Sequence, residues 1–163
     1  MKLKYLLIPL ILVFASNVPA FDGKKNFGIG VMAGDPDGIT GKYRLKNNQA
    51  IDFGFGWKTS GDKEYQFYGN YLIYKYGLIE VPEGKLPLYF GGGMRFITYS
   101  EDDKDSEFGL RIPVGIEYIF WESQLGAFLE LVPVLCLTPD TEFEFGSGIG
   151  IRFFFGSIYH LKD

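Results

Sequence analysis

The chain has 163 residues, of which 18% are aromatic and 22 are glycine, and its formal net charge is −4. This length corresponds to one domain, and the excess of acidic residues argues against nucleic acid as a partner. The single cysteine, Cys136, excludes a framework of intramolecular disulfides.

Residues 1–20 have the layout of a secretory signal peptide. Lys2 and Lys4 precede the apolar run Tyr5–Phe14, and small residues then lead to Val18-Pro19-Ala20. The run is shorter than the roughly 18 to 25 apolar residues of a membrane-spanning helix, and no cysteine near Ala20 offers a site for lipid attachment. We therefore expect cleavage after Ala20 and a mature domain over residues 21–163.

Period-two alternation of apolar and polar residues dominates the mature chain and predicts β-strands. Turn-forming residues such as Asp35-Pro36-Asp37-Gly38 and Pro82-Glu83-Gly84 separate the alternating segments. Eight strands are predicted: Asn26–Gly34, Ile39–Asn47, Ala50–Lys58, Glu64–Tyr76, Leu86–Tyr99, Glu107–Phe120, Gln124–Leu137 and Phe143–Phe155.

One face of these strands is bulky and apolar, whereas the other mixes glycine with charged residues. In the third strand Ile51, Phe53, Phe55 and Trp57 share one face, and Ala50, Asp52, Gly54, Gly56 and Lys58 share the other. A water-facing surface gains nothing from glycine, which weakens strands. The narrow lumen of an eight-stranded barrel does need small residues beside a few long ones, and a membrane barrel carries its apolar face outside.

The predicted fold is therefore all-β: a closed antiparallel transmembrane β-barrel of about eight strands in an up-and-down meander. Closure follows because backbone groups in hydrocarbon have no water to bond. The expected location is the bacterial outer membrane, reached through the periplasm. The expected partners are the lipid bilayer and, during biogenesis, the barrel assembly machinery.

Aromatic residues near strand ends predict girdles at the membrane interfaces. They are Trp57, Tyr65, Tyr74, Tyr76, Tyr99, Tyr118 and Trp121. Phe153 and Phe155 close the last strand with alternating aromatics, a pattern similar to the terminal signal that the assembly machinery reads.

Several stretches resemble a family of uncharacterised small outer-membrane proteins related to the OmpA-type transmembrane domain. They are Gly28–Tyr43, Ala50–Trp57, Leu86–Gly93, Leu110–Tyr118, Phe128–Pro133 and Gly148–Arg152. The resemblance implies a barrel in the outer membrane, and it implies no catalytic residues.

The charged residues on the glycine face are predicted to form a lumen network of Arg44, Asp52, Arg95, Arg111, Glu117, Glu130 and Arg152. Because a buried charge is costly unless it is paired, we expect these residues to pair with one another. Counting back from the turns places Arg44 opposite Asp52 and Arg95 opposite Arg111. It also makes Glu130 the hub, as the only carboxylate beside both Arg111 and Arg152.

No motif predicts catalysis, a cofactor or a metal. Gly28-x-Gly30, Gly54-x-Gly56 and Gly148-x-Gly150 open no helix after a parallel strand, so they are better explained as lumen glycines than as phosphate loops. His160, the single histidine, has only Ser157 and Asp163 nearby in the sequence. Cys136 is expected to be a packed cysteine, and one histidine with one distant cysteine makes no zinc site.

The favoured function is a small outer-membrane barrel with a structural or surface-interaction role, closed by its own side chains and not an enzyme. A narrow pore or transport component is the main alternative. A soluble, lipocalin-like periplasmic barrel that binds lipid is the third.

Overall fold

The structure is a computed structural model that describes residues 27–45, 48–58, 63–100, 104–120 and 124–155. The predicted signal peptide lies outside these residues. Among them no helix has the length and hydropathy needed to cross a membrane. The described residues form nine strands: β1 (Phe27–Gly34), β2 (Gly38–Arg44), β3 (Gln49–Lys58), β4 (Glu64–Lys75), β5 (Leu88–Tyr99), β6 (Glu107–Arg111), β7 (Val114–Ile119), β8 (Leu125–Thr138) and β9 (Glu142–Phe155).

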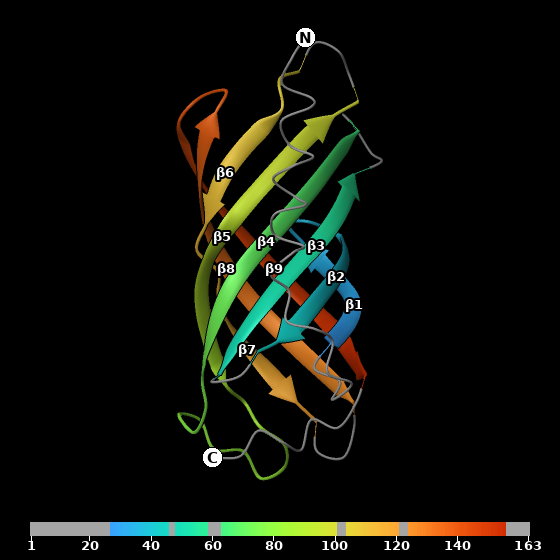
Figure 1. The fold of residues 1–163 in the computed structure, drawn as a ribbon, viewed down its shortest axis with the longest axis vertical. Helices are drawn as coiled ribbons and strands as arrows, with labels where there is room; N and C mark the ends of the chain where they lie inside the picture. The colour runs from blue at the N-terminus through green and yellow to red at the C-terminus, as the bar shows by residue number, and fades with distance from the viewer. Residues whose placement is uncertain (1–26, 46–47, 59–62, 101–103, 121–123, 156–163) are drawn as a thin grey trace.

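The nine strands form one antiparallel sheet that closes on itself (Figure 1). Neighbours in sequence pair from β1 to β5, and β9 pairs with both β8 and β1. In the closing ladder Phe27 lies opposite Phe155, and Gly34 lies opposite Gly148. The predicted closed antiparallel meander is confirmed.

Strands β6 and β7 together occupy one strand position of the barrel. Both pair with β5 on one side and β8 on the other, and β6 lies nearer one end of the barrel than β7 (Figure 1). The prediction of an unbroken strand over Glu107–Phe120 is corrected here, because the strand is interrupted at Ile112 and Pro113. Proline has no N–H to donate to a ladder, so Pro113 interrupts the strand. The described sheet therefore has nine strands at eight strand positions.

The two ends of the barrel differ in their connections. One end, which we call the mouth, receives the connections β1–β2, β3–β4, β5–β6 and β8–β9. The other end, the base, receives β2–β3, β4–β5 and β7–β8 together with the ends of the described chain at Phe27 and Phe155. The β4–β5 connection at the base spans residues 76–87.

The predicted faces are confirmed along the strands. Phe53 on β3 is 45% exposed on the outside, whereas its neighbour Asp52 is fully buried in the lumen. On β9, Ile149 and Ile151 point outward and Arg152 is fully buried. Lys58 was expected on the inner face, but it lies at the mouth with an exposed side chain.

The predicted aromatic girdles are partly wrong. Trp57 and Tyr65 are exposed on the outside near the mouth, as expected. Tyr74, however, continues the inward alternation of β4 and is 2% exposed. Tyr76 packs beside it, and Trp121 lies outside the described residues. Strand alternation, rather than closeness to a strand end, therefore decides which tyrosines reach the surface.

Glycines make room for aromatic rings that lie across the lumen. A methyl group on Gly54 would meet the Tyr68 ring at 2.3 Å, and one on Gly150 would meet the Phe128 ring at 2.6 Å. Gly28 in the same way faces the Phe154 ring at 2.6 Å. The interior is thus filled by large side chains packed against bare backbone.

Candidate functional site

Among the residues that the structure describes, eleven polar or charged side chains are buried inside the barrel. Each is at most 6% exposed: Thr40, Lys42, Arg44, Asp52, Gln66, Asn70, Arg95, Arg111, Glu117, Glu130 and Arg152. All seven residues of the predicted charge network are among them. The structure groups them into three clusters along the lumen and changes several of the expected pairings.

The mouth cluster is built around Arg95 of β5. Its Nη2 lies 2.6 Å from Glu144 Oε2 and 3.7 Å from Glu107 Oε2, and its Nη1 lies 3.8 Å from Asp35 Oδ2. These three carboxylates were not predicted as partners. The alternation of β9 was a usable signal for Glu144, since it shares the inner face with Gly146 and Gly148.

The expected placement of Arg95 directly opposite Arg111 is wrong. The register of β5 and β6 pairs Arg95 with Gly109 and Arg111 with Gly93. Each arginine therefore faces a glycine, which gives it room and avoids the repulsion of like charges placed directly across a ladder.

The middle cluster joins two acid–base pairs. Arg152 Nη2 lies 3.3 Å from Asp52 Oδ2 and donates to Thr40 Oγ1 at 2.7 Å. Asn70 donates to Asp52 at 2.8 Å. Next to this pair, Arg111 Nη2 lies 3.7 Å from Glu130 Oε1, and the Tyr89 hydroxyl donates to Glu130 at 2.9 Å.

The role predicted for Glu130 as a hub is therefore half right. Glu130 pairs with Arg111 as expected, but the carboxylate paired with Arg152 is Asp52. The prediction assigned Asp52 to Arg44 and therefore left Glu130 as the carboxylate expected for Arg152.

The base cluster gathers two cations around Glu117, whose side chain is fully buried. Lys42 Nζ lies 3.4 Å and Arg44 Nη2 lies 3.3 Å from Glu117 Oε2. The Tyr74 hydroxyl donates to the same oxygen at 2.7 Å and accepts a hydrogen bond from Lys42. Glu117 is thus the acceptor that Lys42, Arg44 and Tyr74 share at this end of the lumen.

The expected placement of Arg44 opposite Asp52 is also wrong. The β2–β3 register pairs Arg44 with Ala50 and Lys42 with Asp52, so Arg44 lies closer to the base and reaches Glu117 instead. Sequence reasoning missed Lys42, although it alternates with Thr40 and Arg44 on β2 and shares their inner face.

Aromatic faces supply further contacts for the buried cations. Lys42 Nζ lies 4.7 Å from the centre of the Tyr89 ring, and the Arg152 guanidinium carbon lies 3.7 Å from that of Phe128. Desolvated cation–π contacts of this kind contribute up to about 2 kcal/mol. The lumen therefore holds its charges by ion pairs, hydrogen bonds and ring faces together.

Cys136 belongs to the mouth cluster. It is 4% exposed, and Arg95 Nη2 lies 3.0 Å from its Sγ. Ligand atoms of Cys136, Glu107 and Glu144 lie within 4.8 Å of one another, but the Arg95 guanidinium already contacts all three side chains. A cation at this point would have to compete with that resident positive charge. His160, Ser157 and Asp163 lie outside the described residues.

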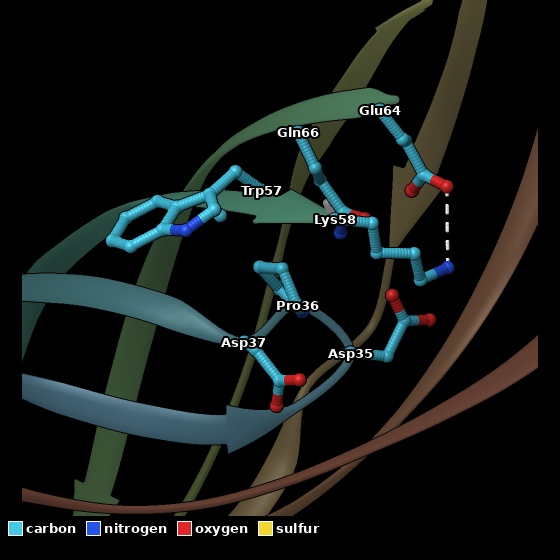
Figure 2. A pocket seen from close by; sticks show the side chains of 8 residues that line it. Asp35, Pro36, Asp37, Trp57, Lys58, Glu64 and Gln66 are labelled. Carbon is cyan, nitrogen blue, oxygen red and sulfur yellow. Dashed lines mark hydrogen bonds and ion pairs between the residues drawn. The ribbon is translucent and has the colours of Figure 1, made fainter. Parts of the chain in front are cut away.

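A small hollow lies at the rim of the mouth (Figure 2). Asp35, Pro36 and Asp37 of the β1–β2 connection form one side, and Lys58 and Glu64 form the other. Lys58 and Glu64 point toward one another with 3.2 Å between Nζ and Oε2. This exposed pair is a rim contact outside the buried network.

Comparisons with known proteins support the fold. No protein-family model matches the chain, and no curated protein matches it in sequence. Among solved structures, it is similar to the N-terminal β-barrel domain of Pseudomonas aeruginosa OprF, with a TM-score of 0.58 and 18% sequence identity. The match covers 80% of this chain and 98% of that chain. At this identity the similarity shows that the two chains share a closed β-barrel fold.

Proposed function

We propose that the protein is a small outer-membrane β-barrel with a structural or surface-interaction role, whose lumen is closed by its own side chains. In this proposal residues 1–20 are a signal peptide, and the barrel assembly machinery inserts the mature domain into the outer membrane. The domain then belongs with small outer-membrane proteins related to the OmpA-type transmembrane domain. It has no catalytic site and needs no cofactor.

The observation that carries the proposal is the inverted distribution of polarity. Large apolar side chains on the outside are exposed, including Phe145 at 62%, Ile149 at 60% and Val31 at 56%, whereas Asp52, Glu117 and Arg152 are fully buried. Monomeric soluble proteins rarely expose large contiguous apolar surfaces. It matches the lipid-facing band of a transmembrane barrel.

The same distribution disfavours the soluble lipid-binding alternative. A lipocalin-like barrel needs an apolar interior, but here the interior holds Lys42, Arg95 and Arg111 with their partners. The aromatic end of β9 supports assembly in the outer membrane, because Phe153 and Phe155 are both exposed on the outside.

The narrow pore is the second candidate, and the charged lumen is the observation that favours it. Ion pairs such as Arg152–Asp52 and Arg44–Glu117 would have to exchange partners to clear a path. We favour the closed barrel because aromatic rings packed on glycines fill the same space.

Fractionation of cells that express the full chain tests the membrane location. We expect the protein in the outer-membrane fraction, extracted only by detergent. Its mobility on a denaturing gel should change on heating, as is typical of folded membrane barrels. Recovery as a soluble periplasmic protein would overturn the proposal.

A further inference from the structure

The junction between β6 and β7 is a point in the described sheet where the ladders toward both neighbouring strands lack a hydrogen bond. Toward β5 the register continues across the junction without a shift, with Gly93 opposite Arg111 and Phe90 opposite Val114. Toward β8, Arg111 lies opposite Val134 and Val114 lies opposite Leu131. The step between these points is Ile112-Pro113, which belongs to neither β6 nor β7.

Two prolines remove one hydrogen bond from each side of this step. In an antiparallel ladder a hydrogen-bonded pair exchanges two N–H···O bonds. Gly91 N donates to Pro113 O at 2.9 Å, but Pro113 has no N–H to return. Ile112 N donates to Pro133 O at 2.9 Å, and Pro133 likewise returns nothing. Each pair at the junction is therefore held by one bond instead of two.

The segment of β5 that faces the junction is also rich in glycine. Gly91, Gly92 and Gly93 follow one another on β5, and consecutive glycines add flexibility and remove side-chain packing. A methyl group on Gly92 would come no nearer than 4.0 Å to another described atom outside its chain neighbours. Side chains of β5 therefore do not cover the junction at this level.

On the lumen side, the residue next to the junction makes few polar contacts. Arg111, which precedes Ile112, is 2% exposed, yet its Nε, Nη1 and Nη2 form no hydrogen bond with a described residue. Its nearest carboxylate oxygen is Glu130 Oε1 at 3.7 Å, and its guanidinium lies over the Tyr68 ring. Arg152, by contrast, is held through hydrogen bonds to Thr40 and Asp52.

We propose that the barrel wall opens locally at the Ile112-Pro113 junction while the rest of the ladder stays closed, and that this opening connects the level of Arg111 in the lumen with the outside of the barrel. The opening depends on backbone pairing, so it does not require the proposed outer-membrane location. It is lateral, through the wall, and differs from a pore that runs along the lumen from mouth to base.

Hydrogen exchange of the refolded full chain in detergent micelles tests the opening residue by residue. The amides of Gly91 and Ile112 should exchange at least about tenfold faster than ladder amides in the middle of β3, a factor equivalent to the loss of about one net hydrogen bond. Equal protection at the junction and on β3 would overturn the proposal.

Proline replacement tests the cause. Pro133→Val restores an N–H at a position of β8 that faces outward. Pro113→Val restores an N–H at a buried position, and valine has a volume similar to that of proline. Each should slow exchange of its single-bonded partner, Ile112 or Gly91 respectively, by about tenfold. Leu131→Val is the matched control, because it changes an outward side chain of β8 and adds no donor. Unchanged exchange in both valine variants, or equal slowing in the control, would contradict the proposal.

A reversible crosslink covers the case in which the valine variants do not refold. Phe90 and Val114 lie directly opposite one another and are 44% and 49% exposed. Phe90→Cys with Val114→Cys, in a Cys136→Ser background, should close the junction when oxidised. Exchange at Gly91 should then slow and recover on reduction. Identical exchange in the oxidised and reduced forms would show that the wall does not open there.

Discussion

At the scale of single residues, the lumen is a set of charges whose burial is tolerated because each has a partner. Glu117 is the clearest example, since one carboxylate oxygen serves Lys42, Arg44 and Tyr74. Removal of the acid from such a buried site leaves a cation without a partner, and this costs much more stability than removal of the acid from an exposed ion pair. The exposed Lys58–Glu64 pair at the rim offers the natural comparison.

Glu117→Gln should therefore destabilise the barrel strongly. The change leaves Lys42 and Arg44 without their carboxylate, which typically costs about 3 to 5 kcal/mol, whereas Glu64→Gln should cost at most about 1 kcal/mol. Urea unfolding of the refolded protein in detergent gives both values. If the two variants share one midpoint, the base cluster contributes no more than a surface pair.

The glycines of the inner face make a second prediction at this scale. Gly54→Ala places a methyl group 2.3 Å from the Tyr68 ring, and overpacking of this kind costs about 1 to 3 kcal/mol. Gly69→Ala is the matched control on the neighbouring strand, because a methyl group there meets nothing within 4 Å. Unfolding midpoints should fall for the first variant and stay level for the second. A fall of equal size in both would point to strand flexibility rather than lumen crowding.

At the scale of the element, each strand separates two environments one residue apart. On β3 the change from Asp52 to Phe53 takes the chain from a fully buried carboxylate to a ring that is 45% exposed. The Phe53 ring leans over Gly41 of β2, where a methyl group would lie 2.5 Å from it. An outward aromatic thus covers a bare position of the adjacent strand.

Phe53→Arg should impair folding into lipid vesicles. An arginine on the lipid face at mid-membrane costs on the order of 2 to 4 kcal/mol, and the conservative variant Phe53→Leu should cost much less. Refolding yield and unfolding midpoints in vesicles measure both. A harmless Phe53→Arg would mean that this face does not contact lipid.

At the scale of the whole molecule, three charge clusters and a series of rings on glycines occupy the lumen from mouth to base. Arg95, Arg152 and Glu117 each lie at the centre of one cluster. A path for ions through this interior requires several buried pairs to separate at once. Closure is therefore a property of the whole set and does not rest on a single gate.

Pure protein reconstituted in a planar bilayer should show no stable open channel. The filled lumen is the physical reason, and a known porin added to the same bilayer serves as the positive control. Reproducible single-channel steps from the pure protein would make the narrow pore the better interpretation of the charged lumen.

The sequence by itself determined the fold class, the eight strand positions and the two faces of the strands. Strand alternation depends only on the period of two along the backbone, so Asp52, Glu117 and Arg152 could be assigned to the same face as the glycines without coordinates. The interruption at Pro113 was also visible in the sequence, because proline lacks a ladder donor. It was missed because the alternation continues across it.

Only the tertiary structure decided which charges meet. Pairing depends on strand register, and a shift of two residues keeps every side chain on its face while it exchanges every partner. That is why Arg44 lies opposite Ala50 instead of Asp52, and why Arg152 lies opposite Gly126, four residues from Glu130. Their actual partners, Glu117 and Asp52, lie on strands that are not their neighbours. Contacts across the lumen, such as Lys42 with Glu117 and Arg95 with Glu144, likewise join strands that are not neighbours in the sheet. Closure of the barrel brings these residues together, and no local pattern in the sequence records the distance between them.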